Sequence, residues 1–165
     1  MVPELPFVLS IAALSLSLAG LAGLVAGLRR SNDIRAIDRF RLREIVEFAF
    51  ANALLALSII PLATLTGNLE ATVRAIAAAA AAYLVAISAV LVRRLRHADI
   101  AMTAWVRIAG AVDLMIVMAS IAAIASGSFA WLQVMLILFL ARPMVAFLFV
   151  LASFDTDDPG SPAER

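Results

Sequence analysis

Asp113 and Arg142 are the ionisable residues that lie deepest within long apolar segments of the sequence. Charged side chains are costly inside a bilayer, so those found there usually pair with one another or serve a function. Asp113 precedes Ala125 by 12 residues and Arg142 follows Phe129 by 13 residues. At a helical rise of about 1.5 Å per residue, both lie about 18–20 Å from the same boundary. The short turn around Gly127 should make the two segments antiparallel neighbours, so we expect an intramembrane ion pair.

Two polar residues on other apolar segments could complete this site. Tyr83 lies at a similar depth and Asn52 about one helical turn from it, and either could satisfy hydrogen bonds that a buried pair requires. The cluster has two interpretations, a structural clasp that fixes the register of the helices or a gated route for protons or ions. We favour the clasp, because a proton relay needs a chain of titratable groups that reaches both surfaces.

Glu47 and Arg107 each lie about one turn inside the boundary that carries most arginines. We expect them to extend toward water, or to pair and so link their two segments, rather than to act in catalysis.

The composition excludes several kinds of chemistry. The chain contains no cysteine and no lysine, so it has neither a thiolate nucleophile nor a Schiff-base amine, and its single histidine cannot supply a pair of metal ligands. It has no phosphate-binding glycine loop, hydrolase elbow or zinc-protease motif. We therefore expect a protein that is not an enzyme and that has no catalytic residues, no cofactor and no metal site.

The elements that position these residues follow from hydropathy. Hydrophobic residues make up 64% of the 165 and the mean hydropathy is +1.04, which is typical of a membrane protein. Segments of about 20 apolar residues predict spanning helices, here at 7–28, 45–65, 73–92, 103–125 and 129–154. The predicted fold is all-α, a polytopic integral membrane protein with a five-helix transmembrane bundle in one domain, 1–154. We expect the alanine-rich third span near its centre, and a disordered cytoplasmic tail at 155–165.

Arginine placement predicts the orientation. The connections after the first and third spans hold nine of the 13 arginines, so these connections should be cytoplasmic, with the amino terminus outside and the carboxyl terminus inside. Stretch 29–44 should be a connection, or a helical extension of the second span at the headgroups. On the other side, Glu70 and Arg74 have the spacing of a helical ion pair that Asn68 could cap. The lysine-free, alanine-rich composition suggests the cytoplasmic membrane of a bacterium.

Small residues recur every fourth position in the first span, at Ser15, Ala19, Gly23 and Gly27, and predict a close partner helix. Whether that helix belongs to this chain or to a second subunit stays open. The leading hypothesis is a small non-enzymatic accessory or scaffold protein that associates with itself or with a larger membrane complex. The alternative is a small oligomeric channel or proton-coupled transporter that uses the Asp–Arg pair. Anionic lipid headgroups could contact the arginines, whereas acids interleaved among them argue against nucleic acid.

Overall fold

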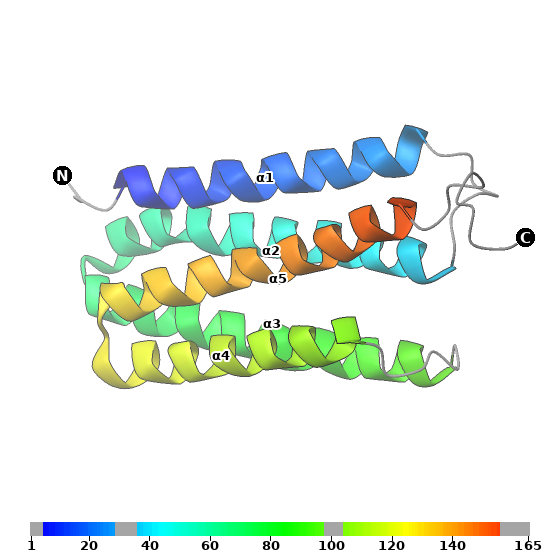
Figure 1. The fold of residues 1–165 in the computed structure, drawn as a ribbon. Helices are drawn as coiled ribbons and strands as arrows, with labels where there is room; N and C mark the ends of the chain where they lie inside the picture. The colour runs from blue at the N-terminus through cyan, green and yellow to red at the C-terminus, as the bar shows by residue number, and fades with distance from the viewer. Residues whose placement is uncertain (1–4, 29–35, 98–103, 156–165) are drawn as a thin grey trace, which may run out of the picture.

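The computed structural model describes residues 5–28, 36–97 and 104–155. They form five helices, α1 (Leu5–Leu28), α2 (Ala36–Thr66), α3 (Leu69–His97), α4 (Ala104–Ser126) and α5 (Phe129–Asp155). Successive helices run in opposite directions, so α1 begins at one end of the bundle and α5 finishes at the other (Figure 1).

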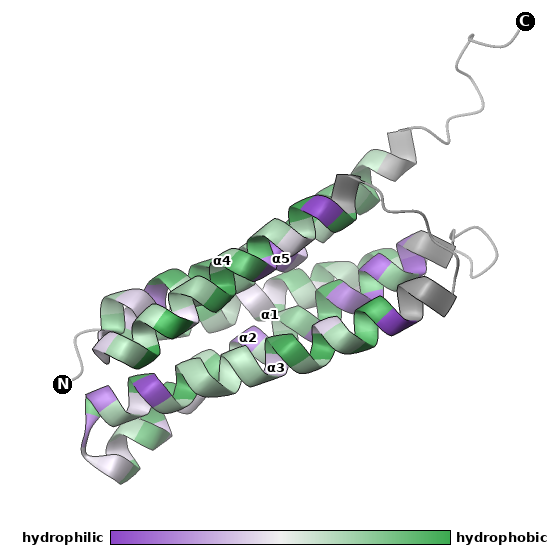
Figure 2. Ribbon diagram, turned by 90° about the horizontal axis from the view of Figure 1, so that it is seen from below, coloured by the Kyte–Doolittle hydropathy of each residue, from purple (hydrophilic) through white to green (hydrophobic). Residues whose placement is uncertain are grey.

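All five helices are long and apolar enough to cross a membrane, which confirms the predicted fold class. Hydrophilic positions gather toward the helix ends and apolar positions fill the stretches between them (Figure 2). The helices extend beyond the predicted spans, most of all α2, which begins at Ala36 instead of residue 45. At 31 residues α2 is about 46 Å long and exceeds a hydrocarbon layer of about 30 Å. Of the tail expected at 155–165, Asp155 is the last residue of α5, and 156–165 lie outside the described residues.

Two tight turns set the antiparallel pairing. Gly67 between α2 and α3 has φ 61° and Gly127 between α4 and α5 has φ 64°, a left-handed conformation that glycine adopts without steric cost. The N–H of Gly127 donates to the Ala123 carbonyl at 2.8 Å and closes the last turn of α4. Each turn therefore reverses the chain within two residues and brings the helices on either side of it into contact.

The start of α3 is as predicted. The side-chain oxygen of Asn68 accepts a hydrogen bond from the Ala71 N–H at 3.1 Å, so Asn68 caps the helix. Arg74 and Glu70 form an exposed ion pair at 2.6 Å. These charges mark one end of the bundle.

The centre of the bundle is formed by α2 and α5, which corrects the expectation that the third span lies there. Helix α5 contacts all four other helices, and α2 contacts α1, α3 and α5. The alanine run of α3 leaves Ala78, Ala79 and Ala82 exposed. Alanine side chains bury little area, whereas the charged and amide side chains of α2 and α5 need partners on several sides, which favours a central position for these helices.

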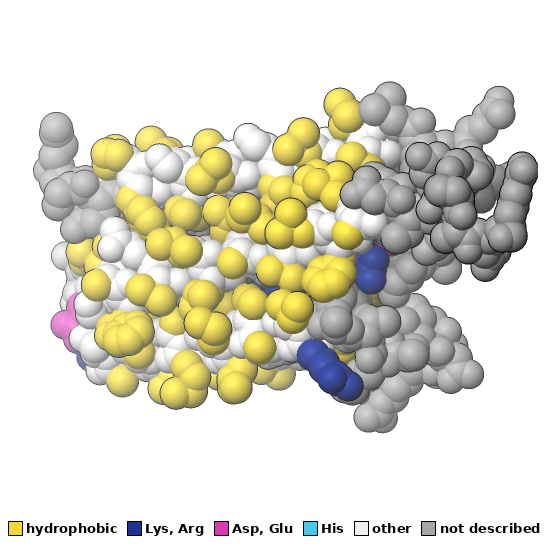
Figure 3. Space-filling view, viewed as in Figure 1, with side chains coloured by type: hydrophobic (Ala, Val, Ile, Leu, Met, Phe, Trp, Pro, Cys, Tyr) yellow, Lys and Arg dark blue, Asp and Glu magenta, His cyan; other side chains and the backbone are white. Residues whose placement is uncertain are grey.

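The outer surface is apolar. Hydrophobic side chains are spread over the middle of the face shown in Figure 3, and most charged side chains visible there lie toward its two ends. The large exposed hydrophobic residues are mainly leucine, isoleucine, valine and methionine. Such a surface is compatible with the hydrocarbon layer of a bilayer, because lipid tails are as apolar as the side chains that face them.

Candidate functional site: an intramembrane charge cluster

The expected ion pair between α4 and α5 is present. The Arg142 Nε donates a hydrogen bond to Asp113 Oδ1 at 2.8 Å. Asp113 is the tenth residue of α4, about 14 Å from its first residue, and Arg142 lies at the middle of α5. Other side chains of α4 near Asp113 are exposed on the outer surface, namely Leu114, Met115 and Met118.

A third charged residue, Glu44, joins the pair from α2. Its Oε1 forms an ion pair with Arg142 Nη2. Glu44 and Arg142 are almost completely buried, with 1% and 4% of their side chains exposed, whereas Asp113 is 21% exposed. The sequence interpretation allowed stretch 29–44 to be a helical extension of the second span, and α2 does extend back to Ala36, but it did not anticipate that Glu44 is buried against Arg142. We call Glu44, Asp113 and Arg142 the charge cluster.

The charge cluster contains one more acid than base. Two carboxylates share one guanidinium, so with all three groups ionised the formal charge is −1. Glu44 Oε2 is buried and has no hydrogen-bond partner among the described residues. Uncompensated charge in a low-dielectric interior costs several kcal/mol, so this imbalance distinguishes the cluster from a neutral clasp.

An aromatic layer, formed by Phe48, Tyr83 and Phe139, packs beside the charge cluster. The Phe48 ring lies 6.0 Å from Tyr83 and 5.7 Å from Phe139 between centroids, and Tyr83 and Phe139 are 6.1 Å apart. Arg142 Cζ lies 5.1 Å from the centroid of Phe48, a cation–π distance. Helix directions place this layer on the side of the cluster nearer the turns at Gly67 and Gly127.

Beyond the aromatic layer the described interior is mainly apolar, with Val73, Ile76, Ile116 and Leu132 fully or almost fully buried. The buried Ser120 hydroxyl donates to the Ile116 carbonyl of its own helix at 2.8 Å. The other buried polar side chains toward these turns bond to backbone carbonyls or to one another; they are Ser15, Asn52 and Thr72. None of these hydrogen bonds joins the charge cluster to that end of the bundle.

Tyr83 lies in the aromatic layer and Asn52 lies about two helical turns beyond Glu44 on α2, and the bonds of both are made outside the charge cluster. The Tyr83 hydroxyl donates to the Glu47 backbone carbonyl at 3.2 Å and so joins α3 to α2. Asn52 Nδ2 donates to Ser15 Oγ at 3.0 Å and to the Leu136 carbonyl at 3.3 Å. Asn52 thus connects α1, α2 and α5 rather than completing the shell of the Asp113–Arg142 pair.

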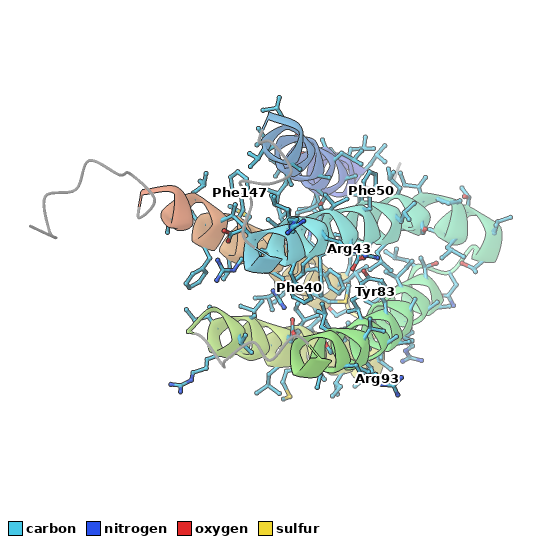
Figure 4. All side chains as sticks on the ribbon, turned by 90° about the vertical axis from the view of Figure 1, so that its right-hand side faces the viewer. Phe40, Arg43, Phe50, Tyr83, Arg93 and Phe147 are labelled. Carbon is cyan, nitrogen blue, oxygen red and sulfur yellow. The ribbon has the colours of Figure 1, made fainter. Side chains whose placement is uncertain are left out.

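The charges nearer the helix ends form local pairs. Glu47 pairs with Arg43 on its own helix at 2.7 Å, and Arg107 is exposed, so the described structure shows no ion pair between Glu47 and Arg107. Figure 4 views the bundle from this arginine-rich end, with Arg43 on α2, Arg93 on α3 and Tyr83 between these helices.

A second buried pair was not anticipated from the sequence. Arg41 bonds Asp38 at 3.0 Å and donates to the Phe149 carbonyl of α5 at 3.4 Å. Its guanidinium carbon lies 5.6 Å from the Phe149 ring centroid. The first turns of α2 are therefore anchored to the last turns of α5.

A half-enclosed cavity of about 120 Å³ lies between α3, α4 and α5 beside the charge cluster. Asp113 and Arg142 form its polar wall together with Ser88, and the other lining residues are apolar or glycine. These are Leu91, Val92, Val106, Ala109 and Gly110. The exposed part of the Asp113 carboxylate is thus adjacent to a small, mainly apolar space.

Comparisons with protein-family models, curated proteins and solved structures found no match. The functional argument therefore depends on the chemistry of this bundle. Within 5–28, 36–97 and 104–155, no three histidine, aspartate or glutamate side chains come together as a metal site.

The small-residue strip of α1 divides into two parts. Ser15 and Ala19 are buried against the bundle, whereas Gly23 and Gly27 are exposed. A Cβ added at Gly23 or Gly27 would meet no atom within 4 Å. The partner of the first part therefore belongs to this chain, and the Gly-x-x-x-Gly part has no partner among the described residues.

Proposed function

We propose that the protein is a non-enzymatic integral membrane subunit that associates laterally with itself or with a larger membrane complex. The observation that carries this proposal is the exposed Gly23–Gly27 part of the α1 strip. Glycines spaced in this way let the backbone of another helix approach closely, and packing of that kind drives helix association in lipid.

A shallow apolar groove between α4 and α5 gives further support. It has a volume of about 410 Å³ between α4 and α5, and Met115, Met118 and Trp131 contribute to its walls. Methionine side chains adapt to irregular partners, so such a groove suits the side chains of a neighbouring helix.

The interior supports a structural role for the charge cluster. Its three charges come from α2, α4 and α5, and the aromatic layer separates them from the far end of the bundle. A chain without cysteine or lysine has few nucleophiles available, and the buried carboxylates are engaged with Arg142. These features favour a clasp that fixes helix register over a catalytic site.

The proposed setting is the cytoplasmic membrane of a bacterium, with the amino terminus outside and the carboxyl terminus in the cytoplasm. The support is the arginine bias, because Arg43, Arg93 and Arg107 are exposed at the end where α1 finishes and α5 finishes. Anionic lipid headgroups are the proposed partners of these side chains.

The alternative is a small oligomeric channel or proton-coupled transporter, and one observation favours it. The surplus acid of the charge cluster is not needed to neutralise Arg142, and Asp113 faces a cavity. Single cysteines at Ser120 and Ala123, beyond the aromatic layer, discriminate between the proposals. In a subunit without a conducting path, an impermeant thiol reagent added on either side of the membrane should label neither cysteine. In a channel, the reagent should label them.

The lateral-assembly proposal is tested with a matched pair of α1 variants. Gly23→Leu places a large side chain on the exposed glycine face, where a Cβ meets no neighbour within this chain. Ser17→Leu makes a similar change at an exposed position about 120° around the helix from Gly23. Both variants should fold, and only Gly23→Leu should reduce the mass of the assembly purified from native membranes.

Disulfide crosslinking gives a second measurement, because the chain has no cysteine of its own. A single cysteine at Gly27 should crosslink to a neighbouring copy or to a cysteine-bearing partner, and a cysteine at Ser17 should not. A particle of one chain that remains monomeric in native nanodiscs, with no crosslink from Gly27, contradicts the proposal.

A further inference from the structure

We propose that the cavity beside Asp113 binds a small organic cation, an alkylammonium ion of about five non-hydrogen atoms. The site consists of the Asp113 carboxylate, backed by Arg142 and Glu44, and the apolar walls contributed by α3 and α4. This inference is independent of lateral assembly, since a subunit or a transporter could equally contain such a site.

The charge balance gives the sign of the ligand. Glu44 is the more deeply buried acid and forms an ion pair with Arg142 Nη2. One carboxylate is sufficient to neutralise one guanidinium, so the second acid adds a negative charge that the described side chains do not balance. Asp113 bears part of that charge where the cluster meets the cavity. A cation placed there restores neutrality of the charge cluster, whereas an anion would add to its surplus negative charge.

The volume and walls of the cavity give the size and character of the ligand. A dry cavity of about 150 Å³ accommodates benzene, which has six heavy atoms, so about 120 Å³ suits about five. Leu91, Val92 and Val106 provide apolar surface for an alkyl group. The Ser88 hydroxyl is the one uncharged polar side chain in the lining and can accept a hydrogen bond from an ammonium group. A branched alkylammonium matches this combination better than a hydrated metal ion.

Isobutylammonium is the probe that fits these dimensions. Isothermal titration of the full chain in a non-ionic detergent should give saturable binding with one ion per chain. Isobutanol, which has the same shape and no charge, should bind at least tenfold more weakly. Isobutyrate, which has the opposite charge, should give no saturable heat.

Four variants test the location of the site. Asp113→Asn removes the carboxylate, and Glu44→Gln removes the surplus charge from a residue that does not line the cavity. Gly110→Leu fills the space while all three charges remain, and its Cβ meets no atom within 4 Å. Each of these should weaken isobutylammonium binding at least tenfold. Glu70→Gln removes an exposed acid at the other end of the bundle and should leave the affinity unchanged.

Two results would overturn the proposal. Absence of saturable isobutylammonium binding to the unmodified chain would mean that a proton alone compensates the surplus acid. Equal binding to the unmodified chain and to Gly110→Leu would place the ion elsewhere, for example on the detergent surface. The Gly110→Leu and Glu44→Gln results decide the question even if Asp113→Asn does not fold. Neither outcome bears on the Gly23→Leu experiment, so failure of one proposal is distinguishable from failure of the other.

Discussion

Replacing Arg142 by methionine should destabilise the bundle more than any other single substitution in the charge cluster. The Arg142 guanidinium contacts Glu44 and Asp113, and only 4% of the side chain is exposed. Its removal leaves two carboxylates near each other in an apolar interior. Breaking a buried ion pair by removal of one partner costs about 3–5 kcal/mol, and we expect a loss in unfolding free energy of this size.

Neutralising one acid should have a much smaller effect. Glu44→Gln leaves the Asp113–Arg142 pair and Asp113→Asn leaves the Glu44–Arg142 pair, so each variant retains one acid for one base. The lost ion contact is offset by relief of repulsion between the two carboxylates, and the amide remains able to accept a hydrogen bond from Arg142. We expect each single variant to lie within about 1 kcal/mol of the unmodified chain, as for an ordinary hydrogen bond.

The double variant Glu44→Gln with Asp113→Asn should behave differently, because it leaves the guanidinium without any counter-charge. The cost should again approach about 3–5 kcal/mol. This exceeds the sum of the two single effects by at least about 1 kcal/mol, as expected for residues that contact a common partner. A neutral clasp with one acid would show no such pattern.

Reversible unfolding in mixed micelles of increasing SDS fraction measures these free energies. The fluorescence of the two tryptophans, Trp105 and Trp131, serves as the reporter. Glu70→Gln is the control for loss of an acid at an exposed pair. Additive effects of the two acid variants would refute the reasoning. A loss as large for Glu44→Gln as for Arg142→Met would also refute it, since it would mean that Glu44 is essential for neutralising the guanidinium.

Three further predictions concern the aromatic layer, the two glycine turns and the attachment of α1. Phe48→Ala should lower the unfolding free energy by about 3–5 kcal/mol in the same assay, because it opens a cavity in the aromatic layer and removes the cation–π contact. Gly127→Ala should lower the unfolding free energy more than Gly67→Ala. Both substitutions place a Cβ on a residue in the left-handed conformation, which costs about 1–2 kcal/mol, but only at Gly127 does the new Cβ collide with a side chain of α3. Asn52→Ala removes a hydrogen bond to α1, so the rate of amide hydrogen exchange should rise in α1 and remain unchanged in α4. Adding Ser15→Ala to Asn52→Ala should raise the exchange rate in α1 little further, because both substitutions remove the same hydrogen bond.

Hydropathy and spacing were sufficient to predict the helices and the Asp113–Arg142 pair. Long apolar runs predict spanning helices because lipid requires each backbone polar group to be satisfied within the segment. The pair could be predicted because the turn at Gly127 is too short to allow any arrangement except antiparallel neighbours. Depth then follows from the helical rise alone.

Glu44 was missed because a hydropathy window ends where charges begin. The signal that could have revealed it is periodicity rather than hydropathy. Buried positions of α2 continue at three- and four-residue spacing from the charged segment into the apolar one. They include Asp38, Arg41, Glu44, Phe48 and Asn52. A stripe that continues without interruption from charged into apolar sequence indicates one helix whose charged side chains face the interior.

The central position of α5 could not be derived from the apolar content of single segments. All five spans have similar hydropathy, so this property cannot rank them by burial. Which helices lie at the centre depends on contacts between pairs of helices. Arg142 forms ion pairs with residues of both α2 and α4, two helices that do not contact each other directly. A side chain that bridges two such helices forces its own helix between them.

The number of acids also bears on why the cluster exists. Buried ion pairs are often no more stabilising than apolar side chains of similar volume, so stability alone does not account for three charges in this interior. A clasp for register needs one acid and one base, and the Asp113–Arg142 pair already links α4 to α5. Glu44 links α2 to this pair but adds a surplus negative charge. Asn52 links α1 to α5 without adding charge, because its side chain is neutral. The surplus acid is therefore better explained by a cation that the cavity admits than by packing, and the Glu44→Gln variant separates these two explanations.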